Sequence, residues 1–440
     1  MTFNSIIFII FFLPIFLLSF FICKKKYRYI VLLIASLVIY SYSGLFNFNV
    51  LMTISIVNYI LIKIFNNKKN REKYLKLLAI LNLITLFAFK FNNSILLPLG
   101  ISFYTFNNIM YIMDIKRKKI SPEKNFFYYL TYVTCFIHIT MGPLINYDKI
   151  KEKIQNLSPT KEEFYNGYKR FLYGFIKKII IADNLGLLYM NIKSMESCTI
   201  FSNISLMVIF GLQLFIDFSS YTDMAIGLGK MIGLSYPENF DHPYHSTSIS
   251  DFWRRWHMSL NYFIKYYIYI PLGGNRVSKK RFKLNLLIVW TLTGLWHGTT
   301  LNYILWGLYY FIILIIEKNY LKNFINKQPN IIKHLYVLFI IFIGNILFSF
   351  TNIREMLFYI QNFITKGFIN NDILFYIKEN IILLIIGIIL CTYIPDKIIE
   401  LTRKNKIYDL LTNIVLVILF IISIAYLING SYSPFLYNAF

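Results

Sequence analysis

Two histidines lie where a protonated imidazole would be costly, and they are the first candidates for chemistry. His297 belongs to the string GLWHG and sits in an apolar stretch, 284–308, that contains no Lys, Arg, Asp or Glu. Burial disfavours the charged ring, so we expect a neutral imidazole that can accept a proton near neutral pH. A general base acting on a hydroxyl needs this state. His257 lies 40 residues earlier (297 minus 257) and is the second candidate.

The surroundings of His257 allow more than one interpretation. Asp251 precedes Arg254 by three residues and Arg255 by four, so on a helix its carboxylate can pair with one or both guanidinium groups. Trp253 lies four residues before His257 on the same helical face, which makes a stacked, structural histidine a rival to a catalytic one. An interfacial helix, with arginines at lipid headgroups and tryptophans in an aromatic belt, would explain the same residues.

A turn and a basic stretch follow this region. The string PLGGNR ends at Arg276 and leads into four more basic residues within 279–283, which could bind the phosphates of an anionic donor. A cytoplasmic loop that obeys the positive-inside rule explains the same charges. His242 and His245, together with His257, raise the question of a metal, but no further ligands lie at a recognisable spacing. We therefore expect no metal.

The composition indicates that membrane-embedded helices must position these groups. The 440 residues are 57% hydrophobic and 15% charged, more apolar than a soluble core of this size needs. The net charge of +24 comes from Lys and Arg in short clusters between apolar stretches. The positive-inside rule produces such clusters, and this distribution argues against nucleic-acid binding. Ionisable groups at membrane depth are costly, so their concentration within 217–307 marks a site.

The apolar segments predict an all-α, polytopic integral membrane protein with about 11–12 transmembrane helices, plus re-entrant or interfacial helices around a central passage. Segment 126–144 has basic residues on both sides, so we expect it to be re-entrant or interfacial. We expect one membrane-embedded domain, 1–440, with a motif-bearing core at about 95–310. The expected spans lie at about 6–22, 29–42, 49–65, 77–91, 95–113, 171–189, 200–217, 284–299, 303–317, 335–350, 379–394 and 411–428.

Several strings, all in one order, resemble the membrane-bound O-acyltransferase family, and specifically its alginate O-acetyltransferase-like branch. The resemblance covers roughly residues 40–310, and the last third of the chain matches mainly in hydropathy and in the ending SPFLY (433–437). Several long strings together are a specific signal. The matching strings are LPLGISFYTF (97–106), KKIIIADNL (177–185), DFSSYTDMAIG (217–227), PENF (237–240), STSISDFWRRWH (246–257), PLGGNR (271–276) and GLWHG (294–298).

The resemblance implies an acyltransferase whose invariant-type histidine falls on His297, with His257 as the second motif histidine, both lining a passage through the membrane core. It implies no bound cofactor and a cytoplasmic acyl thioester, expected to be acetyl-CoA, as donor. One departure is that Lys265 and Tyr266 stand where the family commonly has an Arg-Asp pair. The residues expected to bind substrate or donor, or to line the passage, are Asp217, Asp223, Asn239, Trp253, Arg254, Arg255, Trp296 and Arg276.

The function implied is transfer of an acyl group, usually acetyl, toward a hydroxyl of a cell-surface polysaccharide, by an enzyme of the bacterial cytoplasmic membrane. The expected partners are membrane lipids and a separate secreted or membrane-anchored acyltransferase. D-alanyl transfer to teichoic acid is a close alternative, although PLGGNR favours the acetyl branch. Two non-enzymatic alternatives are a transporter or flippase of cell-envelope precursors, which would predict paired repeats, and a scaffold for cell-wall assembly.

Overall fold

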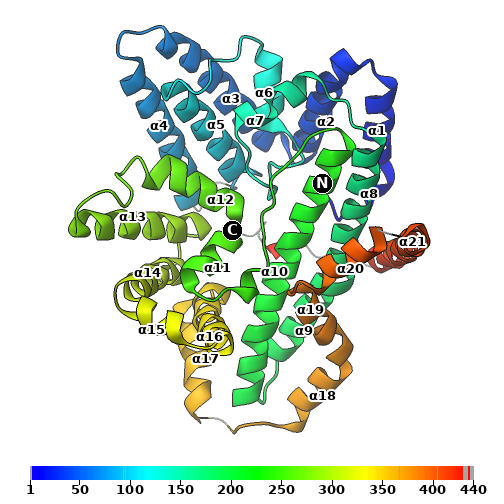
Figure 1. The fold of residues 1–440 in the computed structure, drawn as a ribbon, viewed down its shortest axis with the longest axis vertical. Coiled ribbons are helices and arrows are strands. Elements are labelled where there is room, and N and C mark those ends of the chain that lie inside the picture. Colours follow the sequence, from blue (N-terminus) through cyan, green and yellow to red (C-terminus); the bar gives the residue numbers. More distant parts are fainter. Residues whose placement is uncertain are drawn as a thin grey trace. The chain divides into compact units, whose positions relative to one another are not determined.

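The described part of the chain is built from helices alone. The computed structural model describes residues 2–92, 94, 96–365, 367–403, 405–429 and 435–436, and every regular element in these ranges is helical (Figure 1). This confirms the expected all-α fold. The chain divides into two compact units: unit 1 comprises Met1–Gly174, Tyr221–Glu238 and Tyr262–Tyr267, and unit 2 comprises Phe175–Ser220, Asn239–Asn261 and Ile268–Phe440. The single-domain organisation stays a prediction.

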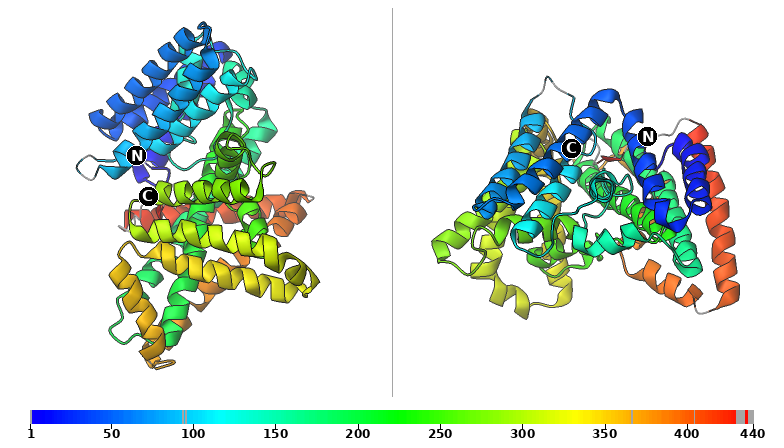
Figure 2. Two further views of the ribbon diagram at one scale, coloured as in Figure 1. Left: turned by 90° about the vertical axis from the view of Figure 1, so that its left-hand side faces the viewer. Right: turned by 90° about the horizontal axis from the view of Figure 1, so that it is seen from above.

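Unit 1 contains most of the first eight α-helices. Helices α3, α4 and α5 lie side by side, as the blue and cyan ribbons of Figure 2 show. Every residue of α5 from Ile101 to Ile115 is buried, so this helix is a core element that is covered on all sides. The helices are α1 (Leu13–Ile22), α2 (Arg28–Tyr42), α3 (Leu45–Asn66), α4 (Arg71–Phe91), α5 (Ile101–Lys116), α6 (Phe126–Thr134), α7 (Tyr147–Gln155) and α8 (Lys161–Ile176).

Unit 2 contains most of the remaining helices and both motif histidines. Helices α13, α14 and α16 pack in that order, and α11 packs against α14 and α16. Helices α10 (Ile200–Met231) and α12 (Met258–Phe263) each contribute residues to both units. The others are α9 (Asp183–Lys193), α11 (Ile249–Arg255), α13 (Lys279–His297), α14 (Leu301–Ile316), α15 (Lys322–Lys327), α16 (Asn330–Ser349), α17 (Ile353–Thr365), α18 (Asn371–Glu379), α19 (Ile381–Leu390), α20 (Ile394–Arg403) and α21 (Lys406–Ile428).

Wider π-helical turns interrupt the helices at several places. One of them, Lys177–Ala182, joins α8 to α9, and another, Glu317–Leu321, joins α14 to α15. Such turns are rare and often occur at functional sites, because each turn displaces the side chains that follow it. Phe8–Phe12 and Ile264–Tyr269 have the same geometry.

Six helices in the described ranges are long and apolar enough to cross a membrane: α3, α4, α10, α14 with its continuation to Lys327, α16 and α21. The pair α18 and α19, bent by 62°, would make a seventh. Large apolar side chains such as Ile418 and Ile421 of α21 are exposed, as lipid-facing side chains are. The multi-pass membrane class is therefore confirmed.

Fewer helices meet this length and hydropathy criterion than the 11–12 expected spans. The expected span 171–189 contains a π-helical turn with Lys177 and Lys178, and the expected span 284–299 lies in α13, whose first turns are basic. Segment 126–144 forms only the nine-residue helix α6 and an irregular chain after it. A helix of that length reaches about 14 Å, half of the hydrocarbon core, so it does not cross alone.

Candidate active site

His297 is the last residue of α13, and glycines bring α13 and α14 into close contact beside it. A Cβ atom added at Gly294 would lie 2.4 Å from the backbone oxygen of Tyr303, and one added at Gly307 would lie 2.4 Å from that of Trp290. Side-chain carbons do not approach backbone this closely, so both positions require glycine. This contact fixes the end of α13 and, with it, the backbone of His297.

The side chain of His297 is buried among aromatic rings. Its ring centroid lies 5.0 Å from that of Trp306 and 5.0 Å from that of Phe348, edge-on in both cases. Trp296, its chain neighbour, lies at 4.6 Å. Only 5% of the residue is exposed to solvent, because these rings shield it. Aromatic rings therefore cover the imidazole.

His257 lies outside any helix, between α11 and α12, and is also buried. Its φ of 46° is in the left-handed region, which is uncommon for a residue other than glycine. Its Nδ1 lies 3.1 Å from Oδ1 of Asn239, and the ring of Phe218 packs edge-on at 4.8 Å. Burial lowers the pKa of His257 to about 3, so its imidazole is neutral at physiological pH.

Trp296 connects the two histidines. Its ring centroid lies 6.4 Å from that of His257 and 4.6 Å from that of His297. Two histidines that are far apart in sequence thus contact one indole, and both belong to unit 2. The catalytic roles of both histidines stay predictions.

Asp217 takes part in a buried ion cluster. Lys178 Nζ lies 2.7 Å from Oδ1 of Asp217 and 2.6 Å from Oδ1 of Asp183. The other carboxylate oxygen of Asp217 accepts a hydrogen bond of 2.8 Å from the backbone N–H of Leu436. Asp217, on α10, therefore contacts the π-helical turn through Lys178 and the C-terminal segment through Leu436. Lys178 also links this cluster to Asp183 of α9, and all of these residues belong to unit 2.

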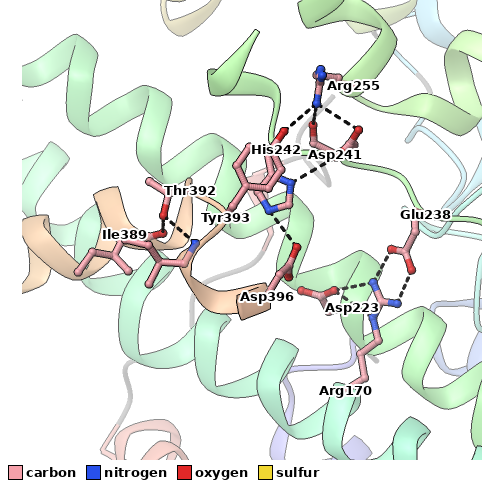
Figure 3. Close-up of polar contacts among 11 residues, drawn as sticks. Arg170, Asp223, Glu238, Asp241, His242, Arg255, Ile389, Thr392, Tyr393 and Asp396 are labelled. Atoms are coloured by element: carbon pink, nitrogen blue, oxygen red, sulfur yellow. Dashed lines mark hydrogen bonds and ion pairs between the residues drawn. The ribbon is translucent and has the colours of Figure 1, made fainter. Parts of the chain in front are cut away.

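The expected pairing of Asp251 is confirmed with both arginines. Arg254 Nη2 lies 2.9 Å from one oxygen of Asp251, and Arg255 Nε lies 3.1 Å from the other. Arg255 also donates to a carboxylate oxygen of Asp241 at 3.2 Å and to the hydroxyl of Tyr393 at 3.0 Å (Figure 3). The two arginines differ in exposure, since 76% of the Arg254 side chain is exposed against 26% for Arg255.

Comparison with known proteins identifies the family. The chain matches the family described as MBOAT, membrane-bound O-acyltransferase, over residues 32–359, a range that includes both histidines. The chain belongs to the membrane-bound O-acyltransferase family. It is therefore a membrane-embedded O-acyltransferase, as the motif strings predicted.

Its relatives are named for alginate, peptidoglycan and teichoic acid. The chain is 35% identical over 382 residues to the probable alginate O-acetylase AlgI of Pseudomonas syringae pv. tomato, covering 80% of this chain and 73% of the relative. It is 29% identical over 420 residues to the peptidoglycan O-acetyltransferase of Helicobacter pylori, covering 82% and 77%. It is 31% identical over 228 residues to the teichoic acid D-alanyltransferase of Bacillus subtilis, covering 49% and 58%.

In this O-acyltransferase, Trp253 does not stack on His257 as its spacing suggested. Helix α11 ends at Arg255, and the chain leaves the helical path before His257 is reached. Trp253 packs instead against Trp290 and Tyr310, with ring centroids 5.0 and 4.8 Å away. The expectation of a shared helical face was therefore wrong, and Trp253 is part of the aromatic core of unit 2.

Two further expected site residues are Asp223 and Arg276. Asp223 belongs to unit 1, where Arg170 Nη2 lies 3.0 Å from Asp223 Oδ1 and 2.5 Å from Glu238 Oε2 (Figure 3). Arg276 is exposed in the loop before α13. The substrate or donor roles predicted for both residues stay predictions.

The sequence did not indicate the polar contacts around His242. Its Nε2 lies 3.1 Å from Oδ2 of Asp396, its Nδ1 lies 3.3 Å from Asp241, and its ring lies 3.9 Å from that of Tyr393 (Figure 3). These contacts hold the start of α20 against the loop before α11. Asp396 is 154 residues from His242 (396 minus 242), and no local spacing signals such a contact. The absence of a metal stays a prediction.

Proposed function

We propose that this enzyme transfers an acetyl group from acetyl-CoA on the cytoplasmic side toward a hydroxyl of a cell-surface polysaccharide, and that a separate extracytoplasmic acyltransferase completes the transfer. Family membership supports acyl transfer, and relatives named for O-acetylation of alginate and of peptidoglycan support both the acetyl group and the polymer. The alginate O-acetylase of Pseudomonas syringae matches 80% of the chain, whereas the D-alanyltransferase of Bacillus subtilis matches 49%.

The observation that carries the proposal is the pair of buried histidines at Trp296. A hydroxyl becomes a nucleophile when an imidazole removes its proton, and the resulting oxygen attacks the thioester carbonyl. Collapse of the tetrahedral intermediate breaks the carbon–sulfur bond. The imidazolium then returns the proton to the thiolate, so the products are an ester and a free thiol. We assign the proton acceptor to His297, and to His257 a supporting role in the same passage.

The donor would approach basic side chains. Arg255 is engaged by Asp251, Asp241 and Tyr393. Arg254 and Arg276 are exposed, as are the basic side chains at the start of α13, which suits them better to meet the phosphates of an anionic thioester.

Replacing His297 tests the proposal. His297→Ala and His297→Gln should each lower acetyl transfer from radiolabelled acetyl-CoA in purified membranes by about 10²- to 10⁴-fold, because each removes the proton acceptor. The Gln variant is the sharper test, since it keeps hydrogen bonding and approximate size. Thermal unfolding in detergent should show a much smaller effect, because loss of one ring among many packed helices costs only a few kcal/mol (roughly 1–3).

A matched control is His334→Gln, which alters a histidine of α16 whose Nδ1 lies 3.0 Å from the backbone oxygen of Ser246. This control should keep its activity. If the His297→Gln variant inserts normally and transfers acetyl at a near-native rate, His297 is structural and the assignment is wrong. Running the same assay with a D-alanyl carrier-protein thioester decides the alternative, since turnover of that donor alone would exclude acetyl transfer.

A further inference from the structure

The contact between Asn239 and His257 fixes which ring nitrogen carries the hydrogen. Asn239 Oδ1 lies 3.1 Å from His257 Nδ1, 3.1 Å from the backbone N of Ser259 and 2.8 Å from Ser259 Oγ. A backbone N–H can only donate, so the Asn239 atom that faces it must be the amide oxygen. The same oxygen faces Nδ1 of His257 and has no hydrogen to donate. His257 Nδ1 therefore carries the hydrogen.

The other ring nitrogen is left as an acceptor. In a neutral imidazole with hydrogen on Nδ1, the lone pair is on Nε2. Nε2 of His257 is buried, and among the described residues none makes a hydrogen bond to it. A buried acceptor without a partner costs free energy, and a donating group of a bound substrate would remove that cost. The geometry thus presents one buried, unprotonated nitrogen to a ligand.

The backbone holds this arrangement in place from both sides. The N–H of Asp241 donates to the carbonyl of Arg255 at 3.0 Å, and the N–H of Met258 donates to the carbonyl of Asn239 at 2.8 Å. The left-handed φ of His257 lies between these two bonds. Unfavourable backbone conformations persist where the surroundings over-determine them, and they concentrate at functional sites.

We propose that Asn239 is a positioning residue, whose amide oxygen holds His257 as the Nδ1–H tautomer so that Nε2 accepts a hydrogen bond from a hydroxyl of the bound acceptor other than the one that His297 deprotonates. The inference rests on the proposed acyl transfer. It gives Asn239 a different role from the substrate contact or passage lining expected from the sequence, because three donors already occupy its oxygen. Ser259, which no sequence pattern indicated, completes the same contact.

Nitrogen NMR tests the tautomer without any turnover. The chain has six histidines, so selective ¹⁵N-histidine labelling gives few signals, and His257 is assigned by its loss in His257→Gln. The wild-type spectrum should show a protonated Nδ1 and an unprotonated Nε2 for His257. Asn239→Ala should populate the opposite tautomer. A protonated Nε2 in the wild type, or an unchanged His257 signal in Asn239→Ala, would overturn the proposal.

The pH dependence of kcat tests the functional role. In Asn239→Asp a carboxylate lies beside Nδ1–H and favours the imidazolium form of His257, which cannot accept a hydrogen bond at Nε2. The acidic limb of the profile of kcat against pH should therefore move to higher pH by about one to three pH units. Asn239→Ala should lower kcat with little change in the donor KM. The control is Asn203→Ala, which removes a buried asparagine from the first turn of α10. It should leave both kcat and the position of the acidic limb unchanged.

These outcomes distinguish a failure of the positioning role of Asn239 from a failure of the proposed acyl transfer. An unmoved limb in Asn239→Asp together with near-native kcat in Asn239→Ala overturns the positioning role and leaves acyl transfer intact. If wild-type protein transfers no acetyl group, the proposed function fails, and the spectra still decide the tautomer.

Discussion

At the scale of residues, the two motif histidines are held by different means. His297 ends a helix whose contact with its neighbour is set by glycines, so backbone packing determines its position. His257 lies off the helix and is oriented by a side chain, Asn239. Substitutions that separate α13 from α14 should therefore affect His297, and loss of an amide oxygen should affect His257. The residue type, histidine in both cases, does not by itself predict what holds each ring in position.

The low pKa of His257 makes a prediction for stability. Burial lowers that pKa to about 3, whereas an unfolded chain has an ordinary histidine pKa of about 6.5. Below pH 6.5 the unfolded chain therefore binds a proton that the folded chain does not, and the folded state loses stability as the pH falls. Between pH 7 and pH 5 the loss from this residue is about 2 kcal/mol.

His257→Gln removes this group and tests the prediction. At pH 7 the variant should be less stable than wild type, because its hydrogen bond with Asn239 is altered. As the pH falls to 5, the difference in apparent Tm between the two proteins should shrink, since only wild type carries the penalty. Thermal unfolding in detergent at several pH values measures it. Two curves that stay parallel across this range would contradict the prediction.

At the scale of elements, the contact between α13 and α14 should be intolerant of a single methyl group. In Gly307→Ala the new Cβ would meet the backbone oxygen of Trp290 at 2.4 Å, so the helices must separate. The expected loss of stability is about 1–3 kcal/mol, and displacement of His297 by about 1 Å could lower kcat by about 10²-fold. Thermal unfolding and the acetyl-transfer assay measure the two effects.

Gly387 of α19 provides the matched control for this substitution. A Cβ there would lie 3.6 Å from Leu185, an ordinary contact, so Gly387→Ala should leave activity unchanged and stabilise the helix by up to about 1 kcal/mol. If Gly307→Ala behaves like Gly387→Ala in both assays, close packing at this pair does not position His297.

The elements also show where the sequence was informative. The spacing of Asp251, Arg254 and Arg255 predicted their pairing, because all three lie on α11 and helical periodicity holds within it. The same periodicity failed for His257, since α11 ends at Arg255. The backbone hydrogen bonds that hold the chain after Arg255 are made with residues 239–241, about 16 residues earlier. The local spacing of residues around His257 does not predict these hydrogen bonds.

At the scale of the whole molecule, hydropathy predicted the membrane class but not which segments form long helices. Helix α21 is apolar and mostly exposed, and it was predicted closely. The expected span 95–113 corresponds to helix α5, which is buried on all sides, so its apolar side chains reflect packing within the protein. The C-terminal Leu436 and Asp217 meet although 219 residues separate them, a contact that requires the tertiary fold.

The charge distribution along the whole chain predicts that the basic segments 66–76 and 276–283 both lie in the cytoplasm. Single cysteines placed at the exposed positions Asn70 and Ser278, in a background without the four native cysteines, should react with a membrane-impermeant maleimide only after cells are permeabilised. Cysteines at the exposed positions Leu45 and Thr299, in poorly charged segments, should react in intact cells and serve as controls for access.

The reason is that a cluster of Lys and Arg resists transfer across the bilayer during insertion, whereas short uncharged segments do not. Labelling of either Asn70→Cys or Ser278→Cys in intact cells would place that basic segment outside. The anionic donor could then no longer meet it in the cytoplasm.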